Sequence, residues 1–486
     1  MADNKRCWKI IYSRYEGLEK KALDLVSAEL GSYVNRDAGV YSLHVLPCEK
    51  AEEAKIDSNA VILGVYSENA HIRRFIKEEE IPEGGYVVKV IRDPECESRT
   101  IALITAKAPQ EVFYGAIDFV DDYFVKAIPG SGYCLRQLHV MFDESFGELP
   151  LYTHATAPKI KRRCVFTWGH PINDFRNYIE NMARLKLNQL IIWNDFVPIN
   201  AKEIIDYAHE YGIQMIWGYA WGWSPRACAD FRVADLQKIK EGVLEKFERE
   251  YAPLGVDGIY FQSFTENTGA YIEGRLVADM VTDFVNETAD ALLARHPGLY
   301  IQFGLHAQSV KDHISFISKV DPRIEIMWED CGEFPFDYVP KIPDPEYYKW
   351  TEDFVSKIVH LRGDAKVSML MRGFTTLAWH QFVPQKGSFV LGKNHKRLVD
   401  HDRALMEPMW RHLQTEWMLG GGKAVYDMTN HVLAEGHPDI ALGMAGQFAG
   451  GLWYNEACCA EILWDPTVPY EEICERVAKR RAVEIV

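Results

Sequence analysis

The segment Asp257-Gly-Ile-Tyr-Phe-Gln-Ser-Phe-Thr-Glu266-Asn267 decides the fold. Its apolar part, residues 259–261, predicts a buried strand, which continues into small polar residues and then a carboxylate. Strands that end in polar side chains are typical of a (β/α)8 barrel, in which catalytic groups lie at the C-terminal mouth. We therefore take Glu266 as the first candidate catalytic residue.

Similar segments recur from residue 159 onward, separated by helical patterns of which residues 173–187 form the clearest. Near-continuous apolar strands joined by helices predict a parallel sheet covered by helices. No Gly-x-Gly-x-x-Gly follows the first strand, which favours a closed barrel over a dinucleotide-binding sheet. The predicted strands are residues 164–168, 189–193, 213–217, 258–263, 299–304, 324–328, 366–371 and 423–426.

The length of 486 residues indicates two domains. Residues 1–150 alternate helix and strand signals and predict a compact α+β domain, and residues 143–158 read as a linker. Residues 159–486 predict the catalytic barrel, which closes with a helix at 470–482. The expected fold class is therefore α/β, a (β/α)8 TIM barrel preceded by a smaller α+β domain.

The composition excludes several classes of protein. A formal net charge of -16 argues against nucleic-acid binding, which needs clustered Lys and Arg. No apolar run reaches the length of a membrane span, and the N-terminus lacks a signal-peptide pattern. The 10 Cys show no repeated C-x-x-C spacing and fit reduced thiols. We expect a cytoplasmic protein with a small-molecule carbohydrate as partner, and homo-oligomer formation stays open.

The predicted strand ends bring carboxylates and aromatic rings to one mouth. Glycosidic cleavage needs two carboxyl groups, and Trp rings offer flat apolar faces to sugars. Glu266 is the expected acid, with Glu333 or Asp330 as the second catalytic carboxylate. A strand-end Glu can also be a salt-bridge or capping residue, and the Trp residues can be core. The predicted substrate-binding residues are Trp168, Trp193, Asn194, Trp217, Trp221, Asn267, His306, Glu329 and Arg372.

Other chemistries lack their motifs. No His pair has metal-ligand spacing on one helix, so no metal is expected. No Gly-x-Ser-x-Gly elbow and no phosphate-binding Gly-Lys-Ser/Thr occurs, and no cofactor is predicted. Asp427, Asn430 and His431 follow the predicted eighth strand and complete the set of mouth candidates.

Three stretches resemble the α-glucuronidases of glycoside hydrolase family 67. The segment 257–267 followed by 271–279 is similar to the one that carries that family's general acid, which implies this role for Glu266. The segment 324–334 resembles the next acidic strand end and implies that Glu333 helps to activate water. The N-terminal unit, ending in Tyr114-Gly-Ala-Ile-Asp-Phe, resembles the small domain of α-glucuronidases and β-hexosaminidases.

We therefore expect an exo-acting glycoside hydrolase that removes a terminal sugar, such as a uronic acid or a related hexose, from small oligosaccharides. A non-catalytic carbohydrate-binding barrel is one alternative, because Arg372 stands where the family has a second water-activating Glu. Another is a uronate lyase or isomerase, with Arg372 holding the carboxylate and His306 as base. A β-N-acetylhexosaminidase is disfavoured, because Thr265 replaces the Asp that precedes the catalytic Glu in those enzymes.

Overall fold

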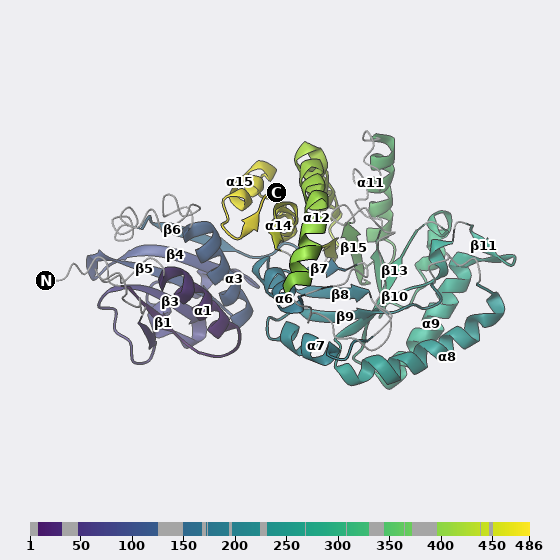
Figure 1. The fold of residues 1–486 in the computed structure, drawn as a ribbon, viewed down its shortest axis with the longest axis horizontal. Coiled ribbons are helices and arrows are strands. Elements are labelled where there is room, and N and C mark those ends of the chain that lie inside the picture. The colour runs from purple at the N-terminus through teal and green to yellow at the C-terminus, as the bar shows by residue number, and fades with distance from the viewer. Residues whose placement is uncertain are drawn as a thin grey trace. The chain divides into compact units, whose positions relative to one another are not determined.

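The computed structural model divides the chain into two compact units, Met1–Lys159 with Glu471–Glu484, and Ile160–Tyr470 with Ile485–Val486 (Figure 1). Each unit is described by itself. Among the described residues no helix is long and apolar enough to cross a membrane. The structure describes residues 8–31, 47–124, 149–167, 172, 174–193, 197–223, 231–267, 269–307, 309–329, 345–363, 365–371, 396–437, 439–446 and 451–486.

The first unit contains a six-stranded sheet in the order β2-β1-β3-β5-β4-β6. Strands β1, β2, β3 and β5 are parallel, whereas β4 is antiparallel to β5 and β6. The central strand β3 is buried along its whole length, as its apolar sequence predicts. The strands are β1 (Trp8–Tyr12), β2 (Cys48–Lys50), β3 (Asn59–Val65), β4 (Tyr86–Asp93), β5 (Cys96–Ala106), β6 (Tyr152–Thr156) and β18 (Val483–Glu484).

Two longer helical segments of this unit lie where the sequence predicts them, at 18–30 and 109–124. The predicted helix at 71–79 is wrong in its second half, because the chain leaves the helix after Arg73. The helical elements are α1 (Gly17–Gly31), η2 (Tyr66–Glu68), α2 (Ala70–Arg73), η3 (Glu78–Glu80), α3 (Pro109–Asp118), its π-helical continuation η4 (Phe119–Phe124) and α15 (Tyr470–Ala478).

The segment predicted as a linker contributes strand β6, so this prediction is wrong for residues 152–156. His154 of β6 pairs with Val88 of β4, and exposure alternates along the strand, as on the edge of a sheet. The C-terminal segment also belongs to this unit by its contacts. The Arg480 guanidinium donates two hydrogen bonds of 2.8 Å to the Asp122 carboxylate, and both side chains are buried.

The second unit is a closed barrel of eight parallel strands, which confirms the expected (β/α)8 fold (Figure 1). Seven strands overlap the predicted segments, and residues 189–193 match to the residue. In barrel order along the chain the strands are β7 (Arg162–Phe166), β8 (Gln189–Trp193), β9 (Gln214–Gly218), β10 (Gly258–Gln262), β13 (Tyr300–Leu305), β14 (Glu325–Trp328), β15 (Val367–Met371) and β16 (Ala441–Ala445).

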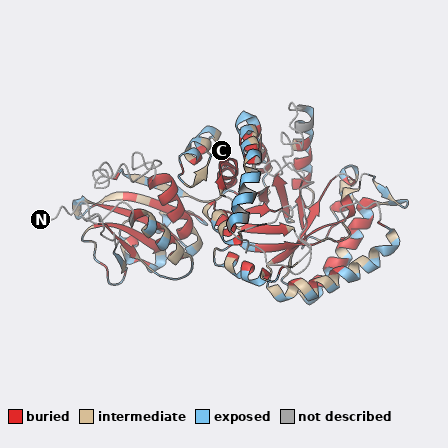
Figure 2. Cartoon of the chain, viewed as in Figure 1, coloured by how far each residue is buried: buried red, intermediate tan, exposed pale blue. Residues whose placement is uncertain are grey.

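Helices surround this barrel, with buried residues toward the strands and exposed residues outside (Figure 2). The first begins where Asp174 accepts a hydrogen bond of 3.1 Å from the backbone N–H of Asn177. The helices are α6 (Phe175–Arg184), α7 (Ala201–His209), α8 (Leu236–Lys246), α9 (Val277–Arg295), α10 (Ile314–Ile317), α11 (Pro345–Val359), α12 (Lys396–Glu416), α13 (Gly422–Ala434) and α14 (Tyr454–Trp464).

Several short elements lie in the connections between the strands and helices of the barrel. They are the 3-10 turns η7 (Val233–Asp235), η9 (Ala252–Leu254), η10 (Phe264–Glu266) and η11 (Lys311–His313), the π-helical turns η8 (Phe247–Tyr251) and η13 (Trp417–Gly421), the hairpin β11 (Tyr271–Ile272) and β12 (Arg275–Leu276), and β17 (Leu452–Trp453).

The predicted eighth strand at 423–426 is wrong, because these residues lie in helix α13. The eighth strand is β16, whose sequence Ala-Leu-Gly-Met-Ala is apolar but short and interrupted by a glycine. Its small residues are required by close packing: a Cβ at Gly443 would lie 2.5 Å from Sγ of Cys164. Asp427, Asn430 and His431 are therefore helical residues and do not follow a barrel strand.

Polar side chains close the N-terminal end of the barrel interior. The carboxylate of Glu325, which is fully buried, accepts hydrogen bonds from Arg162 and from Tyr300 through Oε2. Its Oε1 accepts a bond of 2.9 Å from Nε2 of Gln302, which also donates to Gln189 at 3.1 Å. We call Arg162, Tyr300, Gln302 and Glu325 the base cluster.

Candidate active site

Glu266 lies at the carboxyl end of β10, in the 3-10 turn η10. Two hydroxyl groups fix this turn: Ser263 Oγ donates to the Trp221 carbonyl at 2.8 Å, and Ser309 Oγ donates to the Thr265 carbonyl at 2.5 Å. The Glu266 side chain is 24% exposed. The carboxyl group is thus both accessible and held in place.

The two oxygens of Glu266 meet nitrogen atoms from neighbouring strands. Trp223, beyond β9, donates from Nε1 to Oε2 at 2.7 Å. His306, directly after β13, has its Nε2 3.0 Å from Oε1. The indole nitrogen can only donate, whereas the role of the imidazole nitrogen depends on its tautomer. Three consecutive barrel strands therefore converge on one carboxyl group.

A second carboxyl group meets the same nitrogen of this imidazole. Oε2 of Glu329, the residue after β14, is 2.7 Å from Nε2 of His306. The Glu329 side chain is fully buried, whereas His306 is 8% exposed. Gln262 donates to both oxygens of Glu329, at 3.0 and 2.8 Å. We call Glu266, His306 and Glu329 the mouth cluster.

The alternation of side chains along β14 explains why Glu329 turns inward. Met327 belongs to the barrel interior, and residues two apart on a strand share a face. Trp328 points outward, where its ring packs edge-on against Phe354 of α11 at 4.9 Å. The acidic side chain therefore follows Met327 into the barrel.

Gly304 makes room for this arrangement. A Cβ at this position would lie 2.0 Å from the hydroxyl of Tyr260 and 2.3 Å from Oε1 of Glu329. Tyr260 accepts a hydrogen bond of 2.9 Å from Gln262, so the hydroxyl, the amide and the carboxylate form one connected group. The absence of a side chain at residue 304 is thus a requirement of the site.

Aromatic rings stand beside Glu266. Trp193, at the end of β8, is partly exposed and packs edge-on against Trp223, with ring centroids 5.5 Å apart. It packs in the same way against Tyr260, also at 5.5 Å. A Cβ at Gly218 would lie 2.7 Å from the Trp193 ring, so β9 leaves space for it. Two partly exposed indoles next to a carboxyl group form a surface on which a sugar ring can stack.

The two carboxyl groups of the mouth cluster meet at one imidazole nitrogen. Nε2 of His306 is 3.0 Å from Oε1 of Glu266 and 2.7 Å from Oε2 of Glu329, so one imidazole links the two acids. Within the described residues no group of His, Cys, Asp and Glu could hold a metal ion. Burial raises the pKa of the Cys164 thiol in the barrel core to about 12, so this thiol provides no nucleophile at neutral pH.

Several predicted site residues do converge. Glu266, His306, Glu329 and Trp193 lie together, and Asn267 follows Glu266 in a partly exposed position. Five other predictions, Trp168, Asn194, Asp330, Glu333 and Arg372, lie outside the described residues.

Two predicted sugar contacts are not at the mouth. Trp217 and Trp221 are fully buried. The Trp221 ring stacks on Phe261 at 3.8 Å, and Trp217 packs against Tyr251. Both rings belong to the core, so the expectation that they contact a sugar is wrong. His431 on α13 likewise lies with Ser356 of α11, at 3.0 Å.

The sequence offers Trp223 only as one of the aromatic residues that follow the third predicted strand, and it gives no role to Gln262 or Tyr260. The period of two along β10 carries a signal for Gln262 and Tyr260, because alternate residues of that strand face the interior. Gly222, at a φ of 86°, changes the chain direction just before Trp223. Its place beside Glu266 depends on that turn.

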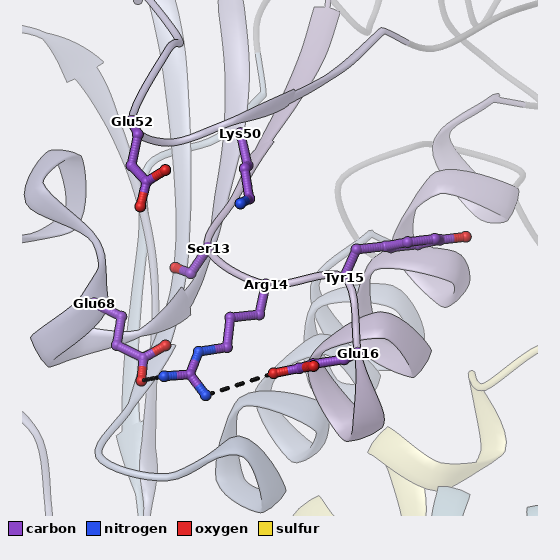
Figure 3. Close-up of a pocket in the computed structure, with 7 residues that line it drawn as sticks. All are labelled: Ser13, Arg14, Tyr15, Glu16, Lys50, Glu52 and Glu68. Carbon is purple, nitrogen blue, oxygen red and sulfur yellow. Dashed lines mark hydrogen bonds and ion pairs between the residues drawn. The ribbon is translucent and has the colours of Figure 1, made fainter.

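A cavity of about 540 Å³ lies elsewhere, in the first unit, where β1 and β2 end (Figure 3). Its guanidinium, from Arg14, is paired with Glu68 at 2.5 Å and with Glu16 at 3.6 Å. Three carboxylates face two cations on this largely exposed surface, so no single ligand class fits the charges. The lining residues are Ser13, Arg14, Tyr15, Glu16, Lys50, Glu52 and Glu68.

No protein-family profile and no curated protein matches the chain. Among solved structures, CpGH84B is 10% identical with a TM-score of 0.50, over 96% of this chain and 70% of that one. CpGH84D is 13% identical with a TM-score of 0.43, over 76% of this chain and 57% of that one. A GH138 enzyme targeting pectin rhamnogalacturonan II is 11% identical with a TM-score of 0.49, over 96% of this chain and 52% of that one.

The chain thus spans little more than half the length of two of these proteins. At such low identity the likeness concerns the fold alone, and it is the likeness to CpGH84B that supports this fold. GH84 is a glycoside hydrolase family, and it is not family 67. The chain therefore has a fold like that of glycoside hydrolases, without a specific link to the α-glucuronidases.

Proposed function

We propose that the chain is a glycoside hydrolase whose active site is the barrel mouth around Glu266. The observation that carries the proposal is the position of this carboxyl group, accessible to solvent and held between Trp223 and His306. The adjoining indole surface of Trp193 supports a sugar as the substrate. The fold shared with CpGH84B agrees with this reading.

In the proposed reaction Glu266 gives its proton to the glycosidic oxygen. The bond from the anomeric carbon to that oxygen breaks, and the electron pair stays with the leaving group. A second carboxylate, Glu333 or Asp330, attacks the anomeric carbon or activates water. Glu329 does not take this part, because a fully buried side chain reaches no substrate.

The proposed substrate is a small glycoside from which the enzyme removes a terminal sugar. The resemblance of residues 257–279 to α-glucuronidases favours a uronic acid at that end, with Arg372 as its partner. The enzyme is proposed to act in the cytoplasm without a cofactor.

The test is a screen of purified protein against aryl α- and β-glycosides, including glucuronides, galactosides and N-acetylhexosaminides. We expect release from one class, lost in Glu266→Gln and retained in Glu287→Gln. Glu287 on α9 is a matched control, because its exposed side chain pairs with Lys240 on the outside of the barrel. Turnover of Glu266→Gln at the wild-type rate would overturn the assignment of the acid.

One observation favours a second candidate, a uronate lyase. His306 lies at the mouth beside Glu266 and is the group that would take up the proton in an elimination. Elimination would leave an unsaturated sugar that absorbs in the ultraviolet, whereas hydrolysis would not. Binding of a sugar without either product would instead indicate a carbohydrate-binding barrel.

A further inference from the structure

We propose that His306 and Glu329 are positioning residues that hold Glu266 and stabilise its anion during proton transfer. The inference rests on the proposed function, because it assigns a task within that reaction. The sequence predicts that Glu329 binds substrate. We assign it instead to holding His306, and through it Glu266, from inside the barrel.

The first argument is the burial of Glu329. A buried carboxylate is costly unless hydrogen-bonded and compensated. Gln262 supplies two hydrogen bonds but no charge, whereas His306, at 2.7 Å, can carry a compensating proton. The imidazole is thereby fixed against the barrel wall, and its Nε2 stays directed toward the mouth.

The second argument is that one nitrogen serves two acids. Nε2 of His306 lies 2.7 Å from Glu329 and 3.0 Å from Glu266, so its N–H can approach either acid, and in the proposed reaction Glu266 begins with a proton of its own. When Glu266 has given that proton to the leaving oxygen, its new negative charge attracts the same N–H. The N–H then turns toward Glu266, and His306 itself gives up no proton.

The third argument is steric. Gly304→Ala perturbs the site without changing any charged group, because an added methyl would overlap the hydroxyl of Tyr260 at 2.0 Å and Oε1 of Glu329 at 2.3 Å. Gly443 provides a matched control on β16. The same methyl there would meet Sγ of Cys164 at 2.5 Å, inside the same barrel but against a thiol rather than the mouth cluster.

The experiment measures kcat and KM for Glu329→Gln, Gly304→Ala and Gly443→Ala on two aryl glycosides of the same sugar. One has a good leaving group, such as dinitrophenolate, and the other a poor one. Acid assistance matters only for the poor one. We therefore expect Glu329→Gln and Gly304→Ala to lose about tenfold or more in kcat on the poor substrate, with little change in KM. Both should lose far less on the good substrate, whereas Gly443→Ala should keep wild-type rates on both.

Equal losses on the two substrates would show general damage and overturn the inference, as would a Gly304→Ala variant that behaves like Gly443→Ala. A second readout does not depend on turnover. In protein labelled with ¹⁵N-histidine, the Nε2–H proton of His306, identified by its loss in His306→Gln, should resonate downfield. It should disappear in Glu329→Gln and persist in Gly443→Ala; persistence in Glu329→Gln would refute the proposed pairing. A wild-type protein that hydrolyses no glycoside would refute the function while this resonance still tests the pairing.

Discussion

The barrel interior contains two polar clusters, one at each end, and they are built on opposite principles. In the base cluster, one buried carboxylate, Glu325, meets the guanidinium of Arg162, the hydroxyl of Tyr300 and an amide. In the mouth cluster, two carboxyl groups, Glu266 and Glu329, meet a single imidazole. The base is balanced in charge, whereas the mouth has a surplus of acid.

The protonation states follow this difference. Burial tends to lower the pKa of Arg162, but the charge of Glu325 outweighs it and the pKa is raised. Burial, and then the same carboxylate, raise the pKa of Tyr300 well above its usual value. The protons of the base are therefore fixed over the physiological range. At the mouth, by contrast, the carboxyl group of Glu266 is accessible to solvent. We therefore assign structural support to the base cluster and the proposed chemistry to the mouth cluster.

The largest expected effect is on turnover at the mouth. Glu266→Gln should lower kcat by about 10²–10⁴-fold, the usual contribution of a general acid, because the amide cannot donate the required proton. The melting temperature should stay within about two degrees of the wild type, since the side chain is partly exposed and the amide keeps most contacts. Calorimetry and steady-state kinetics on one preparation would check both; a large loss of stability would contradict the division of roles.

At the base the same type of change should act on stability instead. Glu325→Gln leaves Arg162 without its buried counter-charge and should cost about 3–5 kcal/mol in the free energy of unfolding. Denaturant unfolding would measure this. The kcat of the folded fraction should remain near that of the wild type. A loss of kcat without a loss of stability would show that the base cluster also takes part in the reaction.

Between these extremes lies the indole hydrogen bond at the mouth. Trp223→Phe keeps an aromatic ring but removes the N–H that Glu266 accepts at 2.7 Å, a bond to a carboxyl group worth about 1.5–3 kcal/mol. We expect kcat to fall and KM to change little. Trp221→Phe is the control, because its fully buried indole lies in the core; similar kinetic losses in both variants would indicate a packing effect.

The smallest expected effect is on the stability of the protein at alkaline pH. The folded-state pKa of Tyr300 lies above its unfolded value, so its contribution to stability is complete below about pH 10 and is lost as the pH rises further. Tyr300→Phe should make the melting temperature fall less steeply between about pH 9 and pH 11. An unchanged slope would show that other buried tyrosines, such as Tyr178, dominate the alkaline loss.

Sequence reasoning predicted the barrel well because its strands are nearly continuous apolar runs, as at residues 189–193. It failed at β16, where the apolar run of residues 440–445 is short and includes Gly443, whose lack of a side chain is dictated by contact with Cys164. It also failed where an aromatic residue could face either way: Trp221 faces the core, whereas Trp193 faces the mouth. Only the register of the closed barrel decides that direction.

The site was partly predictable for a related reason. Glu266 and His306 end their strands, and strand ends of a barrel meet at one mouth. The burial of Glu329 was not predictable, because it depends on contacts between strands distant in sequence. Local patterns indicate which groups reach the mouth but not how deeply each is covered.

Gly304 has a consequence for how this site can change. The hydroxyl of Tyr260 and the carboxylate of Glu329 occupy the volume that any larger residue at 304 would need. An added methyl at 304 therefore presses on the phenol ring of Tyr260 and on the carboxylate of Glu329 together. Removing the Tyr260 hydroxyl would still leave its ring carbon Cζ at 2.4 Å and Oε1 of Glu329 at 2.3 Å, so the space at 304 depends on both partners at once.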